Sequence, residues 1–567
     1  MEYSLMFVII VIVLLLTIAL GRYHEKKQWM YLEKKCKEQY GRETDKKYKY
    51  ENWNHIDAYF IRHRTDSAID DITWNDLDMD KVLQKMDYTK SGIGEQALYH
   101  MLRSPLMNKE ELMKREQRIA MMTDEKLRLS LQLQFIRIGH SGKYSIWDYL
   151  ELLEGLGKPS NALSITADLW IMLAIVLTVF YPMAGITALI GGALFNFVRY
   201  FKKKGDIEPY LISFSYLMRI LTSAKNVERI LKEQSVLIDD AEELYENRQV
   251  FQRFLNHSYW IMSPGRMQGS SDPLELLADY LRMIFHLDLM KFNHMLGIVC
   301  SKEKQLGRIM EIMGELDASV SVACYREFLT QNGDVWSYPE FGAKKQIILE
   351  EGYHPLIDKP VVNSIETEQN ILLTGSNASG KSTFLKMVAI NVLFAQTIHM
   401  TLARRYLACF FRVYSSMALR DDIVSGESYY LTEIKALKRI LDQIDTHTVP
   451  VLCLVDEVLR GTNTVERIAA STEILTHLSG RNMLCFAATH DIELTRLLNQ
   501  DYINYHFREE IEQNEIVFSY KLYKGEAKSR NAIRLLEMIG FAPEIIQKAQ
   551  SNAEQFLRTG RWDYVKE

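Results

Sequence analysis

The sequence predicts membrane-spanning helices and an all-α region, followed by a C-terminal α/β domain with a mostly parallel sheet. Three observations predict this arrangement. Residues 5–20 form an apolar run without a charge. Helical periodicity dominates residues 76–160 and 205–330. From about residue 345, short apolar runs that end in Gly, Asp or His alternate with helical stretches, as they do in parallel α/β sheets.

The composition is that of an ordinary globular chain. Its 567 residues are 47% hydrophobic and 25% charged, which excludes a disordered chain, a collagen-like chain and a disulfide-rich mini-protein. At roughly 150 residues per domain, the length suggests three or four domains. A net charge of −5 offers no global attraction for nucleic acid. The six cysteines are scattered without a C-x-x-C pair, which predicts reduced, buried thiols in a cytosolic compartment.

The first apolar run predicts a membrane anchor. Extended to Tyr3–Gly21, it approaches the ~20 residues needed to cross hydrocarbon. The alternative is a cleaved signal peptide, which carries its basic residues before the apolar run, whereas here Arg22 and Lys26 follow it. We therefore expect residues 1–22 to form an uncleaved transmembrane anchor, with its basic flank in the cytoplasm and the N-terminus outside.

A second apolar block, residues 169–198, contains no charge. As one helix it would extend about 45 Å, which is too long for a single crossing. Pro182 and Gly185 near its middle favour a turn. We expect residues 163–198 to form a transmembrane hairpin, and a basic cluster after it is typical of the cytoplasmic side. A buried hairpin in a soluble core is the alternative.

The remaining segments before the α/β domain predict helices and one connector. Residues 23–75 are basic, aromatic and aperiodic, so we expect a juxtamembrane connector. Residues 76–160 and 199–344 have helical patterns, and the α/β domain is expected over 345–567. The helical apolar stripes predict core packing and comprise Leu217, Leu221, Val227 and Leu231, and a second set after Asp272-Pro273.

A phosphate-binding loop follows the apolar strand Ile371–Thr374 and precedes a helical run. Its pattern is G-x-x-x-x-G-K-[ST] in the strand-to-helix context that this motif requires. The expected phosphate-binding residues are Gly375, Ser376, Asn377, Ala378, Ser379, Gly380, Lys381, Ser382 and Thr383. Backbone amides and the helix dipole should bind the phosphates of ATP. Lys381 should reach the β- and γ-phosphates, and Ser382 should coordinate Mg²⁺.

Two further strands end in polar residues that suit the same site. Asp456 and Glu457 follow the apolar strand Val451–Val455. Ligands bind at the carboxyl ends of strands in open parallel sheets, so Asp456 is expected to hold Mg²⁺ and Glu457 to orient and deprotonate the attacking water. His490 follows the strand 483–488 and could contact the γ-phosphate or this water.

A second loop, Ser425-Gly-Glu-Ser428, opens a predicted helix and has a geometry suited to an anion. The first loop already surrounds the phosphates of its own nucleotide. We therefore expect Ser428 to contact a second nucleotide across a homodimer interface and to take part in catalysis in trans. An ordinary helix N-cap is the alternative.

These motifs together resemble the MutS family of DNA mismatch-repair ATPases, which are relatives of the ABC ATPases. The resemblance is carried by TGSNASGKST, by DDIVSGESYYLTE, by DEVLRGTNTVER, by ATHDIEL and by GYHPLI. Residues 86–105 are similar to the start of the family's helical core domain. The resemblance implies an ATPase that dimerises through its ATPase domains and acts on DNA.

The sequence also departs from the family pattern. The position of the family's mismatch-recognition domain holds the membrane anchor and connector, and no Phe-x-Glu wedge motif precedes the core. The F-x-E at Phe507 lies beyond the ATPase motifs. The aromatic residue that stacks on adenine in many members is replaced near Val361.

The leading hypothesis is a membrane-anchored, dimeric ATPase of the inner membrane, with its ATPase domain in the cytoplasm and mismatched, damaged or branched DNA as its partner. ATP is cytoplasmic, so the chain after the first anchor must cross the membrane an even number of times, as a hairpin does. A membrane-tethered mechanochemical or signalling ATPase with a protein partner is the second hypothesis. Half of an ABC transporter is the third.

Overall fold

The structure is a computed structural model that divides into two compact units. The residues it describes are 2–46, 48, 53, 55–141, 145–155, 160–252, 284–376, 379–417, 429–444, 446–459, 462–480, 482–512, 515–527, 533, 536, 539–560 and 562. The first unit contains residues 1–65, 83–102 and 113–333, and the second contains 66–82, 103–112 and 334–567.

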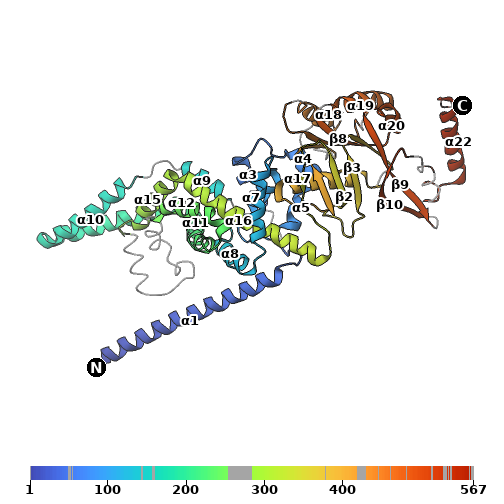
Figure 1. Cartoon of the computed structure of the whole chain (residues 1–567). Coiled ribbons are helices and arrows are strands. Elements are labelled where there is room, and N and C mark those ends of the chain that lie inside the picture. Colours follow the sequence, from blue (N-terminus) through green and yellow to red (C-terminus); the bar gives the residue numbers. More distant parts are fainter. Residues whose placement is uncertain are drawn as a thin grey trace. The chain divides into compact units, whose positions relative to one another are not determined.

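The regular secondary structure among the described residues of the first unit is helical (Figure 1). Its helices are α1 (Glu2–Gln39), α3 (Ala58–Arg62), α6 (Gly92–Arg103), α8 (Glu125–Ile138), α9 (Ile146–Gly155), α10 (Ala162–Phe180), α11 (Pro182–Leu231), η1 (Ser235–Leu237), α12 (Ile238–Gln249), α15 (Leu287–Ser301) and α16 (Glu303–Asn332). Helices α5 (Met79–Met86) and α7 (Lys109–Met121) pass from one unit into the other.

The apolar stripe on α11 forms part of the core of this unit. Leu217, Leu221, Val227 and Leu231 are each at most 1% exposed, and this part of α11 packs against α8 and α12. The core packing expected from the stripe is therefore present. The second stripe, after Asp272-Pro273, lies outside the described residues.

Helix α1 continues beyond the expected anchor. It runs without a break to Gln39, so residues 23–39 are helical and are not part of an aperiodic connector. Their Glu, Lys and Gln content favours a helix even without an apolar stripe. The end of α1 is joined to α8 by the ion pair of Lys37 with Glu125, at 2.6 Å. Just beyond it, the ring of Tyr40 lies 3.4 Å from the guanidinium of Arg128.

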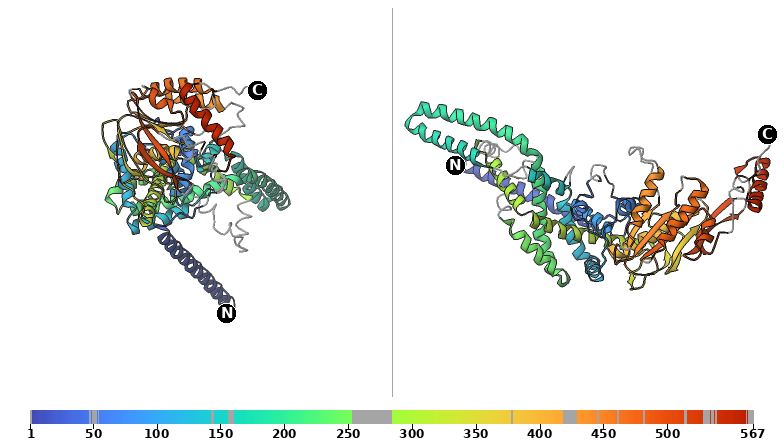
Figure 2. Two further views of the ribbon diagram at one scale, coloured as in Figure 1. Left: turned by 90° about the vertical axis from the view of Figure 1, so that its right-hand side faces the viewer. Right: turned by 90° about the horizontal axis from the view of Figure 1, so that it is seen from above.

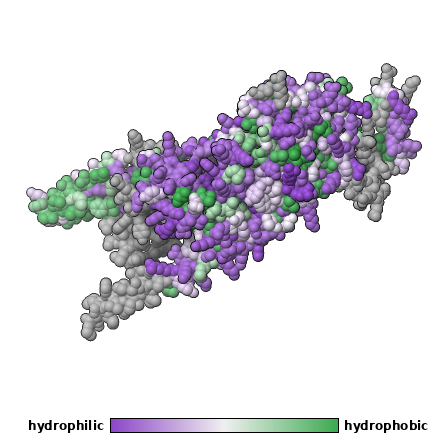
Figure 3. Space-filling model, viewed as in Figure 1, coloured by the Kyte–Doolittle hydropathy of each residue, from purple (hydrophilic) through white to green (hydrophobic). Residues whose placement is uncertain are grey.

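Helices α10 and α11 form the expected hairpin, with the single residue Tyr181 between them (Figure 2). Pro182 occupies the first turn of α11, where its missing N–H leaves no donor unpaired. By length and composition, Ala162–Phe180 and Pro182–Gly205 are both candidate membrane spans. Only 17% and 22% of these segments are buried, which contradicts the buried hairpin that was the alternative. Figure 3 shows the apolar colouring of this hairpin.

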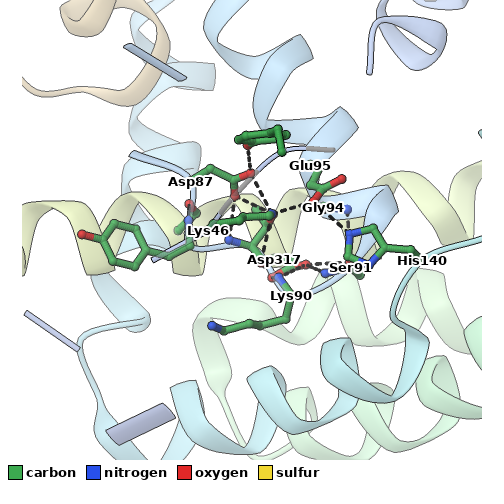
Figure 4. A network of polar contacts seen from close by, with 12 residues as sticks. Lys46, Asp87, Lys90, Ser91, Gly94, Glu95, His140 and Asp317 are labelled. Atoms are coloured by element: carbon green, nitrogen blue, oxygen red, sulfur yellow. Dashed lines mark hydrogen bonds and ion pairs between the residues drawn. The ribbon is translucent and has the colours of Figure 1, made fainter. Parts of the chain in front are cut away.

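A buried polar network joins α16 to the chain on either side of α6 (Figure 4). The Lys46 ammonium lies 2.7 Å from both the Asp87 and Glu95 carboxylates. Asp317 of α16 accepts hydrogen bonds from the Ser91 hydroxyl at 2.6 Å and from the Ser91 amide at 2.9 Å. A Cβ at Gly94 would lie 2.1 Å from Asp317 Oδ2, so only glycine permits this close approach.

The buried Asp317 carboxyl predicts a pH-dependent stability. Burial raises the pKa of Asp317 to about 7, so its contribution to stability is complete below the ordinary carboxyl pKa near 4 and is lost as the pH rises through 7. The wild-type chain should therefore lose on the order of 2–4 kcal/mol of its free energy of unfolding between pH 4 and 7. Asp317→Asn should abolish this loss. The melting temperature of the detergent-solubilised chain across this range measures the effect. Asp239→Asn, at the exposed start of α12, should leave the wild-type profile unchanged; a wild-type profile that is flat from pH 4 to 8 would contradict the role of Asp317.

The second unit is built on a six-stranded, mostly parallel sheet of order β10-β9-β4-β8-β7-β6. These strands are β4 (Asn370–Thr374), β6 (Arg412–Ser416), β7 (Val451–Asp456), β8 (Met483–Thr489), β9 (Tyr502–Glu512) and β10 (Glu515–Lys524). All neighbouring pairs are parallel except β9 and β10. The α/β architecture expected for the C-terminal part is confirmed.

A four-stranded mixed sheet and further helices also belong to this unit. The sheet has the order β1-β5-β2-β3 and was not expected from the sequence. Its strands are β1 (Glu340–Phe341), β2 (Ile347–Gly352), β3 (Asn363–Thr367) and β5 (Arg405–Ala408), and the helices are α17 (Lys381–Ile398), α18 (Tyr429–Leu441), α19 (Thr464–Leu478), α20 (Glu493–Leu497) and α22 (Pro543–Thr559). Helix α17 contacts β7 and β8 of one sheet and β2 of the other, which explains why it is buried on nearly every side.

The second unit also includes residues from far upstream, unlike the expected 345–567 domain. Residues 66–82, which we call the edge segment, contain α4 (Asp71–Asp76) and lie along β6, the outer strand of the large sheet. The amide of Ser415 donates to the Thr73 hydroxyl at 3.1 Å, and the amide of Met417 donates to the Asp76 carboxylate at 3.0 Å. These side chains pair edge donors for which β6 has no strand partner.

Removing the Asp76 carboxylate should destabilise the second unit. Asp76 is 4% exposed and also accepts from the Ser415 hydroxyl at 2.7 Å. Asp76→Ala leaves two buried donors unpaired, so we expect a loss of about 2–4 kcal/mol in urea unfolding. Asp442→Ala, which removes an exposed ion pair with Lys438, is the matched control and should cost less than ~1 kcal/mol. Equal stability of the two variants would contradict the proposed role of the edge segment.

Candidate functional site

The polar residues predicted from the sequence meet at one end of the large sheet. Strands β4, β7 and β8 are parallel neighbours, with Thr374 opposite Thr489 and Asp456 opposite Ala488. Their carboxyl ends therefore lie at the same edge, followed by the phosphate loop after β4, Glu457 after β7 and His490 after β8. This convergence follows from strand order, which the sequence alone did not provide.

The phosphate loop makes a tight turn into α17. Gly380 has φ +110° and Gly375 has φ +149°, a backbone region that residues with a Cβ avoid. The helix begins at Lys381, so its N-terminal amides face the loop. The Lys381 ammonium donates to the carbonyl oxygens of Gly375 and Ser376, both at 2.8 Å. Asn377 and Ala378, which were also predicted to bind phosphate, lie outside the described residues.

The remaining polar side chains are arranged in two pairs. The Ser382 hydroxyl donates to the Asp456 carboxylate. His490 Nε2 lies 2.6 Å from Glu457 Oε1 and 3.4 Å from the Lys381 nitrogen. Glu457 has φ +59°, an uncommon conformation for a non-glycine residue and one that often marks functional sites. The hydroxyl and carboxylate of the first pair are oxygen ligands of the kind Mg²⁺ prefers, so the residues fit this ion.

A cavity of about 620 Å³ lies beside these residues. This volume is in the range of small-molecule and cofactor sites. Its polar lining includes Ser376, the loop residues Ser379 to Thr383, Glu457 and His490. Its apolar and aromatic lining includes Ile357, Pro360, Val361 and Tyr520. Polar groups suited to phosphates and apolar groups suited to a base thus line the same cavity.

Tyr520 is a cavity residue that the sequence analysis missed. The pairing of β9 with β10 shifts register between Phe518 and Leu522, and such a bulge turns a side chain out of its regular position. The Asn363 side chain holds this bulge, because its amide nitrogen donates to the Tyr520 carbonyl and its oxygen accepts from the Leu522 amide, both at 2.9 Å. The bulge interrupts the alternation of side chains between the two faces of β10, so the sequence pattern did not indicate that Tyr520 lies at the cavity.

Two other predicted features have different outcomes. Ser428 lies outside the described residues, which resume at Tyr429, the first residue of α18. Phe507, part of the F-x-E sequence, is 3% exposed, and its ring lies 5.9 Å from that of Phe384 in an edge-to-face contact. It forms part of the cavity wall and is not available to insert into DNA.

Comparison with known proteins agrees with this geometry. Residues 371–557 match the family model of MutS domain V, and this range contains the phosphate loop, Asp456, Glu457 and His490. This part of the chain is thus similar to a domain of the MutS family.

The similar curated proteins are DNA mismatch repair proteins MutS. The chain is 31% identical over 280 residues to that of Pseudothermotoga lettingae, covering 45% of this chain and 34% of the relative. It is 29% identical over 245 residues to that of Thermus thermophilus, covering 42% of this chain and 29% of the relative. For Clostridium botulinum the identity is 30% over 230 residues, covering 37% and 24%. The chain therefore matches about a third or less of the length of these relatives.

The position of Tyr520 in the cavity, fixed by the two hydrogen bonds of Asn363, predicts that both residues contribute to the affinity for nucleotide. Tyr520→Ala removes an aromatic wall of the cavity, and Asn363→Ala removes two hydrogen bonds that hold it. We expect each to weaken ATP binding by about 1–2 kcal/mol, or roughly 5- to 30-fold in Kd. Binding of a fluorescent ATP analogue measures this change. Tyr520→Phe keeps the ring and should bind within about twofold of wild type; full affinity in Tyr520→Ala would exclude Tyr520 from the nucleotide site.

Proposed function

We propose that this protein is a membrane-attached ATPase of the MutS family that hydrolyses ATP at an interface between two copies of the chain and couples hydrolysis to DNA binding. One observation carries the proposal: Lys381, the pair Ser382–Asp456 and the pair Glu457–His490 lie at the end of one parallel sheet. Lys381, Ser382, Glu457 and His490 line a single cavity. The chain's match to MutS domain V supports ATP as the ligand.

The chemistry follows from these side chains. Lys381 would exchange the loop carbonyls for phosphate oxygens and stabilise the charge that develops during transfer. Glu457 would orient a water molecule and accept its proton, and His490, 2.6 Å away, would hold the Glu457 carboxylate in place. Mg²⁺, when bound, would neutralise phosphate charge, with Ser382 and Asp456 as its protein ligands. Excluding bulk water from the cavity would strengthen each of these interactions.

Dimerisation is proposed to complete the site. By the family resemblance, Ser428 of one copy would contact the nucleotide of the other. Exposed apolar side chains on both sides of the sheet end support such an interface. On α18, Leu431 is 43% and Ile434 is 37% exposed, and Val465 at the start of α19 is 76% exposed. Closure of two copies would bury these groups and make hydrolysis depend on the dimer.

DNA is the proposed partner because the similar curated proteins are DNA mismatch repair proteins. The second candidate is a membrane-tethered ATPase that acts on a protein, and the exposed apolar hairpin of α10 and α11 is compatible with either partner. Binding of duplex, mismatched and branched DNA by the full chain in lipid nanodiscs, across a salt series, separates the two. Binding that weakens with salt and responds to ATP supports DNA, whereas no binding at low salt supports a protein partner.

Membrane attachment is proposed from α1 and from the hairpin, with the ATPase unit in the cytoplasm. The hairpin helices expose most of their apolar surface, and basic residues follow both apolar segments. An inner-membrane location is consistent with access to cytoplasmic ATP.

Replacing the proposed general base should separate ATP binding from hydrolysis. Glu457→Gln keeps the size and polarity of the side chain but removes its basicity, so we expect phosphate release to fall by about 10²–10⁴-fold while ATP stays bound. Retained ATP should also increase the dimer fraction, measured by light scattering after size exclusion. Glu473→Gln, at an exposed position further along α19, should hydrolyse ATP at the wild-type rate. Unchanged hydrolysis in Glu457→Gln would assign the base to another residue.

A further inference from the structure

We propose that the hairpin of α10 and α11 enters one leaflet of a lipid bilayer and returns on the same side, so that it does not cross the membrane. The occupant of its apolar surface is the acyl-chain region of that leaflet. This inference rests on the proposed membrane attachment and replaces the two crossings expected from the sequence.

The tip of the hairpin is apolar and exposed. Phe180 is 73% exposed, Tyr181 66% and Met183 81%, and residues 169–198 contain no charge. In a two-crossing arrangement this tip would emerge into water on the far side, where connecting turns are usually polar. Exposed apolar side chains at the turn itself instead fit a tip that stays within hydrocarbon.

Part of the backbone at the tip is hydrogen-bonded internally, which lowers the cost of placing it in hydrocarbon. Tyr181 is the single residue between the two helices; its amide donates to the Leu177 carbonyl and its carbonyl accepts from the Gly185 amide, both at 2.8 Å. Pro182 has no N–H to satisfy. The hydroxyls of Thr178 and Thr187 donate to carbonyls within their own helices, at 2.8 and 2.9 Å. These bonds reduce the number of polar groups that the turn would carry into a membrane.

The base of the hairpin is polar and fixes how deeply it can insert. Asp168 of α10 lies 3.3 Å from His286, whose side chain is fully buried. Asn196 of α11 donates to the Ile284 carbonyl at 2.9 Å, and the Arg199 guanidinium donates to the Leu163 carbonyl at 2.8 Å. These groups form the polar base of the hairpin on both helices, where it is held by residues of its own unit.

The distance from this base to the tip matches one leaflet. From Leu169 to Phe180, the helix rises about 18 Å at 1.5 Å per residue. A hydrocarbon core is about 30 Å thick, or roughly 15 Å per leaflet. A full crossing would require Asp168, His286 and Arg199 to enter the hydrocarbon, which is unfavourable for ionisable groups. Trp170, 55% exposed and just above the base, suits the membrane–water interface.

The test locates the tip with a thiol-reactive probe. Both variants are made in the full chain with the half-buried Cys300 replaced by Ser. The tip variant is Met183→Cys. The matched control is Lys203→Cys, on the exposed polar part of α11. The chain is placed in phosphatidylcholine–phosphatidylglycerol vesicles with the ATPase unit outside, as verified by protease accessibility. A membrane-impermeant maleimide is supplied either outside or sealed in the lumen.

One-leaflet insertion predicts that Met183→Cys reacts from neither side until detergent is added, while Lys203→Cys reacts from outside at once. A fluorophore on the tip cysteine should also be quenched several-fold more by lipids spin-labelled near the chain ends than by lipids labelled at the headgroup. Labelling of the tip from the lumen would overturn the proposal in favour of two crossings. Labelling of the tip from outside would show that the hairpin lies in water and would remove it as a membrane contact.

The proposed ATPase function is tested separately. Phosphate release by the same vesicles reports on Glu457 and the nucleotide site, and its loss would leave the position of the tip unaffected. Conversely, a hairpin found in water would leave the ATPase proposal intact.

Discussion

The open edge of the large sheet is the constraint on which the second unit depends. Among the strands that the structure describes, β6 has a partner, β7, on one side only, and its outer amides would otherwise face either water or another chain. The edge segment meets this need with Thr73 and Asp76, which are 0% and 4% exposed. A stretch of chain more than 300 residues upstream thereby becomes an integral part of the second unit.

The same segment contacts other parts that border the proposed site. Asp78 pairs with Lys386 of α17, the helix that begins with the phosphate-loop lysine, at 2.6 Å. Asp70 pairs with Arg439 of α18, the helix that follows the predicted Ser428 loop. The edge segment thus contacts β6, α17 and α18 and fixes the positions of these three elements relative to one another. A C-terminal fragment that begins at residue 205 or 345 lacks it.

Several polar side chains of the site already bind one another or the loop. Lys381 is bound by loop carbonyls, Ser382 by Asp456, and Glu457 by His490. Binding of ATP would have to replace some of these pairs, so nucleotide occupancy and loop conformation cannot change independently. This arrangement gives a physical basis for coupling binding to a conformational change.

The sequence predicted the local elements around the proposed nucleotide site, β4 and α17, because a glycine-rich loop between a buried strand and a helix has few other interpretations. The strands that carry Asp456 and His490 were also located correctly. The sequence did not predict that residues 66–82 belong to the second unit. They join β6 through the side chains of Thr73 and Asp76, and such contacts leave no periodic pattern in the sequence. It also missed Tyr520, because its position depends on a bulge held by Asn363 from a different sheet. The extent of α1 was underestimated, since charged helix formers in residues 23–39 give no apolar stripe.

Helix α11 extends without interruption from Pro182 at the hairpin tip to Leu231 in the core of the first unit. Its length of 50 residues corresponds to about 75 Å. The sequence places one proline, Pro209, in its interior, where the missing N–H removes a backbone hydrogen bond and gives the helix a point at which it can bend. A bend of about 5° at this point would displace the tip, ~40 Å away, by roughly 3–4 Å. The helix can therefore act as a lever arm, which converts a small rearrangement among core helices into a lateral displacement at its far end.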